Sequence, residues 1–288
     1  MSNKDLLDNI KKLREMTGVG FKDCKIAIDE NNGDIEKSIE FLRKKGIAKA
    51  SKKMSRTASE GLALVKEQDG KISIIEINSE TDFVAKNQDF INFCKELSEI
   101  NFNTKGNLDK INETKMSNGN LVKDNLVNLI AKIGEKITIR RANYLDNSKG
   151  NNFFYVHSAI EKGIGKIISM VKLDGISKGK NDEIGTKIAM HIAASNPLAI
   201  NKDEIEKKIV DKELEIIKAE ISNSGKPADM VEKISKGKIS KFLNDNSLLN
   251  QIWIMDSKKK VSDVLKENSL DKPLQVLEFK RYKVGEGV

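Results

Sequence analysis

The chain is poor in cysteine, proline and aromatic residues, and these shortages exclude several classes of protein. Its 288 residues include two cysteines, three prolines and one tryptophan, and aromatic side chains make up 5%. Cys24 and Cys94 stand far apart with no second ligand beside either, which excludes a disulfide framework and a cysteine metal site. We expect both to pack as small apolar residues. So few aromatic side chains also supply little stacking surface for nucleic-acid bases.

Long apolar runs are missing as well. No stretch approaches the roughly 20 apolar residues that a membrane-spanning helix needs. The opening segment, MSNKDLLDNIKKL, holds no apolar run of signal-peptide length. We therefore expect a cytoplasmic protein that makes no contact with a membrane.

Charge, by contrast, is abundant and of both signs. Charged residues make up 33% of the chain, and 51 Lys and Arg against 43 Asp and Glu leave a net charge of +8. Such interleaving favours a mixed surface over a single polyphosphate-binding face. One run, from Arg43 to Arg56, carries seven basic residues and no acid. It is either a solvated linker or helix end, or a contact for a phosphate backbone or an acidic partner. A basic docking or RNA-binding protein is therefore an alternative.

Residues 1–54 predict three short helices. Apolar side chains recur at helical spacing on both sides of TGVG (17–20), and NNGD (31–34) separates the second helix from the third. Asp34 can act as the N-cap of this third helix, and Gly46 is expected to end it. Three short helices around a small apolar centre resemble the ubiquitin-associated fold, a docking module with no chemistry of its own.

Residues 55–147 predict the first half of an α+β core. Two runs that alternate apolar and polar residues flank Gly70, which is typical of a β-hairpin. A helix follows, with apolar residues at Phe83, Phe90, Phe93 and Leu97. Residues 101–120 predict a loop or a weak helix, and a further helix turns at Gly134 into an alternating strand.

Residues 148–197 and 251–288 predict a second half of the same kind. FFYVHSAI, GKIISMVKLDG and LQVLEFKRYKV have the pattern of strands, and DEIGTKIAMHIAAS has the pattern of a helix. GKISIIEINS parallels GKIISMVKLD, and KITIRR parallels LEFKRY. These parallels favour two similar α+β halves.

Residues 198–250 interrupt the second half and predict an antiparallel helical hairpin. Their apolar residues form a narrow stripe at heptad-like spacing, made of Val210, Leu214, Ile217, Ile221, Val231, Ile234, Ile239 and Phe242. NSGKP (223–227) is expected to turn the chain between the two arms. The first arm is mainly acidic and the second mainly basic, which favours their pairing, although exposed pairs contribute only ~0.2–1 kcal/mol each.

The sequence assembles no set of catalytic residues. GIGK (163–166) departs from the P-loop pattern at two positions, and His157 and His191 stand in separate segments without a nucleophile motif. His191 lies on an apolar helix, so we expect a core residue with its hydrogen bonds satisfied. His157, near a strand end, is open to a structural or a surface role. We expect no enzymatic activity, no cofactor and no metal site.

The stretch SETDFVAKN (79–87) has two interpretations. In the first, Thr81 or Asp82 is an N-cap whose side-chain oxygen accepts a hydrogen bond from a free helix N–H, and Phe83 is a core residue. In the second, Phe83 projects outward as an apolar wedge for another protein.

Six motifs, in order, resemble bacterial translation elongation factor Ts. They are LREMTGVGFKDCKIAIDENNGDIEKSIEFLRKKG, INSETDFVAKN, IAKIGEKITIRR, AMHIAASNP, SGKP and KVGEGV, and together they extend over nearly the whole chain. The resemblance implies a guanine nucleotide exchange factor that binds elongation factor Tu, both GDP-bound and nucleotide-free, and that binds no nucleic acid directly. It implies an α+β fold with an N-terminal three-helix ubiquitin-associated-like domain, a two-part core of similar halves and an inserted antiparallel coiled-coil hairpin.

The resemblance also assigns residues to the partner interface. The stretch made of Thr81, Asp82, Phe83 and Val84 matches the segment that enters the partner's nucleotide domain and disturbs its magnesium site. Phe83 would be the wedge, and Asp82 a polar group at its base, with the cap aiming the wedge. Further partner contacts are implied at Arg14, Gly18, Val19, Gly20, Lys25, Ile133, Gly134 and His157.

Overall fold

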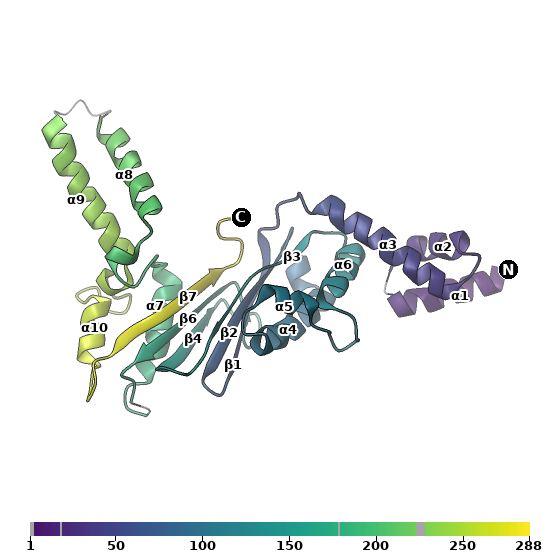
Figure 1. The fold of residues 1–288 in the computed structure, drawn as a ribbon, viewed down its shortest axis with the longest axis horizontal. Coiled ribbons are helices and arrows are strands. Elements are labelled where there is room, and N and C mark those ends of the chain that lie inside the picture. The colour runs from purple at the N-terminus through teal and green to yellow at the C-terminus, as the bar shows by residue number, and fades with distance from the viewer. Residues whose placement is uncertain (1–2, 18, 178, 223–227) are drawn as a thin grey trace.

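The computed structural model describes residues 3–17, 19–177, 179–222 and 228–288. Within them lie ten α-helices and two small antiparallel sheets, which confirms the α+β class. A group of three helices lies at one end of an elongated molecule and a pair of long helices at the other, with the sheets between them (Figure 1). None of the described helices is long and apolar enough to cross a membrane.

The N-terminal group consists of α1 (Asn3–Thr17), α2 (Phe21–Glu30) and α3 (Ile35–Lys53). The Asp34 carboxylate accepts a hydrogen bond from the Lys37 backbone N–H at 3.0 Å, so the predicted cap of α3 is confirmed. The three helices enclose a small core that contains Ile10, Leu13, Cys24, Ala27, Ile28 and Leu42. Cys24 therefore packs as a small apolar residue, as expected.

The predicted end of the third helix is wrong, because α3 continues through Gly46 to Lys53. Glycine in a helix interior costs only about 1 kcal/mol, which packing of the helix can offset. Here α3 packs against α6 (Val122–Ile133), and a Cβ at Gly46 would lie 3.4 Å from the Ala131 Cβ. Gly46 therefore marks a close approach of two helices.

The first sheet has the strand order β3-β2-β1-β5. Its strands are β1 (Glu60–Gln68), β2 (Lys71–Ser79), β3 (Ile137–Leu145) and β5 (Ile164–Gly165). β1 and β2 pair antiparallel around the turn at Asp69 and Gly70, both at positive φ, which confirms the predicted hairpin. β3 pairs antiparallel with β2, so that Ser79 at the end of β2 lies opposite Ile137 at the start of β3.

Three helices contribute to the core on one face of this sheet. They are α4 (Gln88–Asn103), α5 (Leu108–Glu113) and α6. The region 101–120, expected to be a loop or weak helix, thus holds the end of α4 and the short α5. Phe90, Phe93, Cys94 and Leu97 of α4 are all buried in this first core.

The predicted start of α4 is wrong. The Asn87 side chain caps this helix, because its Oδ1 accepts hydrogen bonds from the backbone N–H groups of Asp89 and Phe90 at 3.0 and 3.3 Å. A 3₁₀ turn, η1 (Val84–Lys86), precedes the cap. Phe83 therefore lies outside α4, and neither Thr81 nor Asp82 caps it.

The second sheet has the strand order β4-β6-β7. It contains β4 (Asn151–His157), β6 (Ile167–Asp174) and β7 (Gln275–Lys283), all antiparallel. Side chains of α7 (Glu183–Ser195) and α10 (Val261–Glu267) pack with it in a second core, and a third apolar cluster joins the two sheets. The strand and helix predictions for this region are confirmed.

A buried carboxylate links the first sheet to the C-terminal segment. Glu76 of β2 accepts hydrogen bonds from Arg140 Nη1 at 3.0 Å, Arg141 Nε at 2.5 Å and the Gly285 backbone N–H at 3.0 Å. Burial alone would raise the pKa of Glu76, but the Gly285 N–H and the Arg141 guanidinium hold its pKa below the ordinary value. Glu76 is thus ionised and paired in the interior.

The insertion contains η2 (Lys202–Glu204), α8 (Lys207–Ser222), α9 (Ala228–Asn246) and η3 (Leu248–Asn250). α8 and α9 lie side by side and stand out from the sheets (Figure 1). The expected stripe residues are buried or half-buried, and Lys238 of α9 pairs with Glu220 of α8 at 2.7 Å. The predicted turn at 223–227 lies outside the described residues.

His191 of α7 is a buried residue whose two ring nitrogens both have partners, as expected. Its Nε2 lies 3.0 Å from Gln251 Oε1, and its Nδ1 lies 3.4 Å from the Ile254 backbone nitrogen. The ring also stacks on Trp253, with 5.2 Å between centroids. His191 therefore joins α7 to the segment that follows the two long helices.

We predict that acid destabilises the protein through His191. Burial lowers the pKa of His191, against an opposing effect of the Gln251 hydrogen bond. The unfolded chain takes up a proton near pH 6.5, where the folded protein still holds a neutral ring. The unfolding free energy should therefore fall as pH drops below about 6.5, by at most about 1.4 kcal/mol per pH unit.

Urea unfolding at about pH 5.5 and about pH 7.5 measures this effect. His157 is exposed, so His157→Gln is the matched control and should keep the loss in acid. His191→Gln should be less stable at both pH values but should lose the dependence on pH. An unchanged dependence in His191→Gln would contradict the assignment.

Candidate functional site

Phe83 is the most exposed large apolar side chain among the described residues, at 75%. A phenyl ring in water forgoes about 1.5–3 kcal/mol that burial would provide. The next residue, Val84, is buried in the first core together with Ala85. The chain thus enters the core directly after Phe83 while leaving the ring outside, and the core interpretation of Phe83 is wrong.

Val84 was expected to contact the partner alongside Phe83. In the free protein its side chain is 4% exposed and lies in the first core. Val84 thus anchors one end of the loop that carries Phe83.

The other end of this loop is held by a network of four residues, Glu80, Thr81, Glu135 and Lys136, called here the Glu80–Glu135 network. The Glu135 carboxylate accepts hydrogen bonds from the Thr81 backbone N–H at 3.0 Å and from Thr81 Oγ1 at 2.8 Å. In return, the Glu80 carboxylate accepts one from the Lys136 backbone N–H at 2.5 Å. Each loop thus supplies a carboxylate to the backbone of the other.

The end of α3 joins the same network. Arg56 pairs with Glu80 at 3.1 Å, and the Lys136 ammonium donates to the carbonyl oxygens of Met54 and Arg56 at 2.8 and 2.7 Å. Partial burial would raise the pKa of Glu80, but the Lys136 N–H and the Arg56 guanidinium hold its pKa below the ordinary value. Glu80 is therefore ionised near neutral pH, as these bonds require.

Asp82 and Lys86 form an ion pair at the base of Phe83. Their charged atoms lie 2.8 Å apart, and the Lys86 ammonium stands 5.7 Å from the centroid of the Phe83 ring. The hydrogen bond from Lys86 and, more weakly, the charge of Lys166 lower the pKa of Asp82. Asp82 is thus a charged residue at the surface and does not cap a helix.

The second loop predicted to contact the partner lies beside the first. Gly134 ends α6 at φ 87°, a left-handed conformation in which a side chain would be strained, and its N–H donates to the Ile130 carbonyl. Lys53 at the end of α3 donates to the Gly134 carbonyl. Ile133 packs partly into the first core. The structure therefore brings the loops at 80–83 and 133–136 together.

The predicted contacts on the N-terminal helices are mostly at the surface. Arg14, Gly20 and Lys25 are exposed, whereas Val19 is partly buried against the helical core. Val19 also lines a small cavity together with Ala131 of α6. Gly18 lies outside the described residues.

His157 lies at the end of β4 and is exposed, which favours the surface role for it. Its Nδ1 is 3.3 Å from the Tyr155 hydroxyl. It pairs in the sheet with Ile167, the neighbour of Lys166, whose charge acts on Asp82. The Lys166 ammonium donates to Glu60 Oε2 at 2.9 Å, and Glu60 lies opposite Ser79, the residue before Glu80, so this end of β4 is linked to the end of β2.

Several basic side chains of the run from Arg43 to Arg56 form ion pairs with acidic residues of the same chain. Among the side chains that the structure describes, ion pairs within 3.1 Å join Arg43 to Asp124, Lys44 to Glu40, Lys45 to Asp23 and Arg56 to Glu80. The run forms the second half of α3 and the turn after it, so the helix-end interpretation is confirmed and the linker interpretation is wrong. Its charges help to dock α3 on α6 and on the Glu80–Glu135 network.

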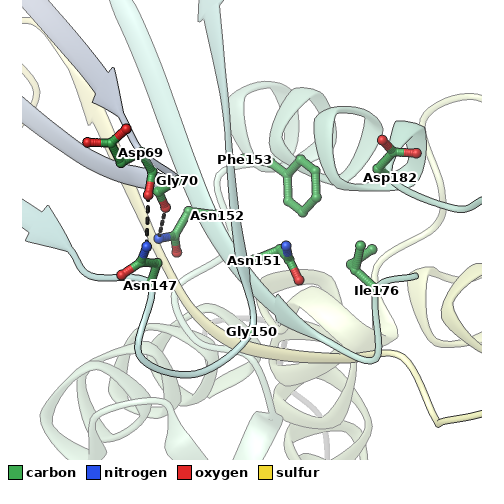
Figure 2. A pocket seen from close by; sticks show the side chains of 9 residues that line it. All are labelled: Asp69, Gly70, Asn147, Gly150, Asn151, Asn152, Phe153, Ile176 and Asp182. Carbon is green, nitrogen blue, oxygen red and sulfur yellow. Dashed lines mark hydrogen bonds between the residues drawn. The ribbon is translucent and has the colours of Figure 1, made fainter. Parts of the chain in front are cut away.

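A cavity of about 480 Å³ lies at the β1–β2 turn, beside the connection from β3 to β4 (Figure 2). The Asn147 amide donates to the Asp69 carbonyl and the Asn152 amide to the Gly70 carbonyl, each at 2.8 Å. These bonds fasten the turn of the first sheet to the segment that leads into the second. In the described ranges, no group of three or more His, Cys, Asp and Glu is placed to hold a metal ion.

Sequence reasoning overlooked the residues that hold the loop. Glu80 directly precedes Thr81, and Glu135 directly follows Gly134. The sequence shows locally only that Glu80 directly follows one predicted strand and that Glu135 directly precedes another. Which backbone groups they bind follows from the pairing of β2 with β3.

This chain is similar to members of one protein family. A family model described as "Elongation factor TS" matches residues 80–286, which begin at the loop of Phe83. The elongation factor Ts of Clostridium kluyveri is 41% identical, over 97% of this chain and 92% of the relative. Those of Rhizorhabdus wittichii and Allorhizobium ampelinum are 38% and 39% identical over the same shares.

We predict that Phe83 contributes little to folding. Phe83→Ala should change the unfolding free energy by less than about 1 kcal/mol, because the residue is 75% exposed and the Lys86 ammonium contributes only a weak cation–π contact. Phe90 is the matched control, since it is the same residue type at 0% exposure, seven positions later. Phe90→Ala should cost about 3–5 kcal/mol.

Urea unfolding of both variants measures the difference. Equal losses of stability in the two variants would show that Phe83 is packed in solution.

Proposed function

Because the chain belongs to the elongation factor Ts family, we propose that it is a guanine nucleotide exchange factor for elongation factor Tu. It binds this partner in its GDP-bound and nucleotide-free states, disturbs the magnesium and nucleotide site and promotes GDP release during translation elongation. The observation that carries the proposal is an exposed phenyl ring, Phe83, on a loop tied at both ends.

Phe83 acts in this proposal as a wedge that enters the partner's nucleotide domain. Thr81 is tied to Glu135 and Val84 is buried, so the ring is presented from a fixed backbone. Asp82 lies at its base as a charged group. Transfer of the ring from water into an apolar pocket contributes about 1.5–3 kcal/mol.

Thermodynamic linkage determines how much differential binding free energy is needed in addition to that of the Phe83 ring. A factor that binds the nucleotide-free partner more tightly than the nucleotide-bound partner weakens nucleotide binding by the same ratio, and nucleotide expels it in turn. A weakening of about 10⁴-fold requires about 5.5 kcal/mol of differential binding. One phenyl ring supplies at most about half of that. Other contacts must favour the nucleotide-free partner as well.

We assign these further contacts to two regions beside the wedge. The first is the neighbouring loop, with Ile133 and Gly134, together with His157 on the second sheet. The second is the N-terminal helical group, with contacts at Arg14, Gly18, Val19, Gly20 and Lys25. The exposure of Arg14, Gly20, Lys25, Gly134 and His157 supports this assignment.

The proposal includes a division of the chain into parts. Residues 1–54 form a ubiquitin-associated-like docking domain. Residues 55–147, together with 148–197 and 251–288, form two similar halves of the core. Residues 198–250 form a coiled-coil hairpin inserted in the second half. The arrangement of three helices, two sheets and one projecting helix pair supports this division (Figure 1).

We further propose that the protein works in the cytoplasm and by binding alone, without catalysing a chemical reaction and without contacting nucleic acid. The ion pairs of the basic run favour this over an RNA-binding role, because they engage the charges that a phosphate backbone would need.

Release of fluorescently labelled GDP from elongation factor Tu tests the proposal. Catalytic amounts of the protein should accelerate release without hydrolysing GTP. Phe83→Ala should slow the accelerated release by about 10–100-fold, the equivalent of about 1.5–3 kcal/mol of lost differential contact. Unchanged release at micromolar concentrations of the wild-type protein would overturn the assignment.

A further inference from the structure

The Glu80–Glu135 network is reciprocal in a way that β2 and β3 impose. Glu80 and Thr81 directly follow β2, and Glu135 and Lys136 directly precede β3. Because Ser79 pairs with Ile137, the two dipeptides leave the sheet side by side. Each carboxylate then reaches a backbone N–H of the opposite dipeptide, at 2.5 Å for Glu80 and 3.0 Å for Glu135.

We propose that Glu135 and Glu80 are positioning residues for nucleotide exchange, which act by fixing the loop that presents Phe83. The inference rests on the proposed exchange function and adds residues that act through the wedge. Neither carboxylate is expected to touch the partner's nucleotide.

The need for such positioning follows from the surroundings of Phe83. The ring is 75% exposed, and the Lys86 ammonium, at the end of a flexible side chain, stands 5.7 Å from its centroid. Packing of the ring therefore cannot hold it in one direction. Val84 and Ala85 in the first core fix the loop after the ring, and Thr81 is the corresponding fixed point before it. Thr81 owes this to Glu135, which binds both its N–H and its hydroxyl.

Glu80 extends the same support to the end of α3. Its carboxylate accepts from Arg56 as well as from the Lys136 N–H, and the Lys136 ammonium binds two carbonyl oxygens of the same segment. Lys53 adds a bond to the Gly134 carbonyl. Lys53, the last residue of α3, and the segment directly after the helix thus bond to both loops and help to fix the backbone that presents Phe83.

A positioning role differs from a merely structural one in what a substitution changes. The four residues of the network are half-buried and lie outside the apolar cores, so the loss of one carboxylate should leave the protein folded and lower its unfolding free energy by about 1–3 kcal/mol at most. The ring itself remains in Glu135→Ala, so binding of the partner should persist. A loop that samples several directions presents the wedge correctly only part of the time. The rate of GDP release at saturating protein should therefore fall, by about 10-fold, for the loss of a charge-assisted pair of hydrogen bonds.

The test compares four variants in labelled-GDP release from elongation factor Tu. They are Glu135→Ala, Glu135→Gln, Phe83→Ala and the double variant Phe83→Ala/Glu135→Ala. Glu135→Gln keeps one acceptor oxygen for Thr81 and should recover part of the rate. Glu113→Ala is the matched control, since it removes an exposed carboxylate that pairs with Lys123 at 2.7 Å on another part of the core. Its rate should equal that of the wild type.

The double variant decides between the two roles. If Glu135 acts through Phe83, adding Glu135→Ala to Phe83→Ala should slow release no further, and the half-saturating concentration of Glu135→Ala should stay within about twofold of wild type. Additive losses in the double variant would overturn the inference. So would full activity of Glu135→Ala beside an active wild type. A wild type without activity would instead overturn the proposed function, and the inference with it.

Discussion

Two carboxylates, those of Glu80 and Glu135, bind the backbone of each other's loop at the end of the β2–β3 pair. An exposed phenyl ring adds little to folding, so the position of Phe83 has to come from bonds made elsewhere. On one side these are the hydrogen bonds of Thr81 to Glu135, and on the other the burial of Val84. These two anchors explain how Phe83, an apolar residue that is unfavourable to expose to water, can have a defined position on the surface.

Helices α3 and α6 both lead to the loop of Phe83. α6 ends at Gly134, directly before Glu135, and its middle packs against α3 where Gly46 lets the helices approach. α3 in turn ends at Lys53, whose ammonium binds the Gly134 carbonyl. One helix of the N-terminal group therefore connects that group to the first core and to the loop of Phe83. The second sheet is linked to the same region by Lys166, which directly precedes β6 and whose ammonium donates to Glu60 Oε2 at 2.9 Å, and Glu60 pairs with Ser79 at the end of β2.

Most elements could be predicted from the sequence, because apolar periodicity and turn residues act locally. The hairpin around Gly70, the turn at Gly134 and the helix of His191 were all predicted from such signals. The end of α3 was predicted wrongly because packing against α6 outweighs the local cost of Gly46. The start of α4 was predicted wrongly because the cap was expected at Thr81 or Asp82, whereas Asn87, further along the chain, forms it. The role of Glu135 could not be predicted, because its partner, Thr81, lies 54 positions away in the sequence and is brought near only by strand pairing.

The central claim, that the loop of Phe83 is fixed before any partner arrives, is tested most directly by amide hydrogen exchange at residue resolution in the free protein. The N–H groups of Thr81 and Lys136 are the two that the carboxylates bind. The account predicts that both exchange slowly, at rates comparable to the amides paired between β2 and β3, and that Glu135→Ala removes the protection of Thr81. Exchange of the Thr81 and Lys136 amides at the rate of an unstructured peptide in the wild-type protein would contradict it.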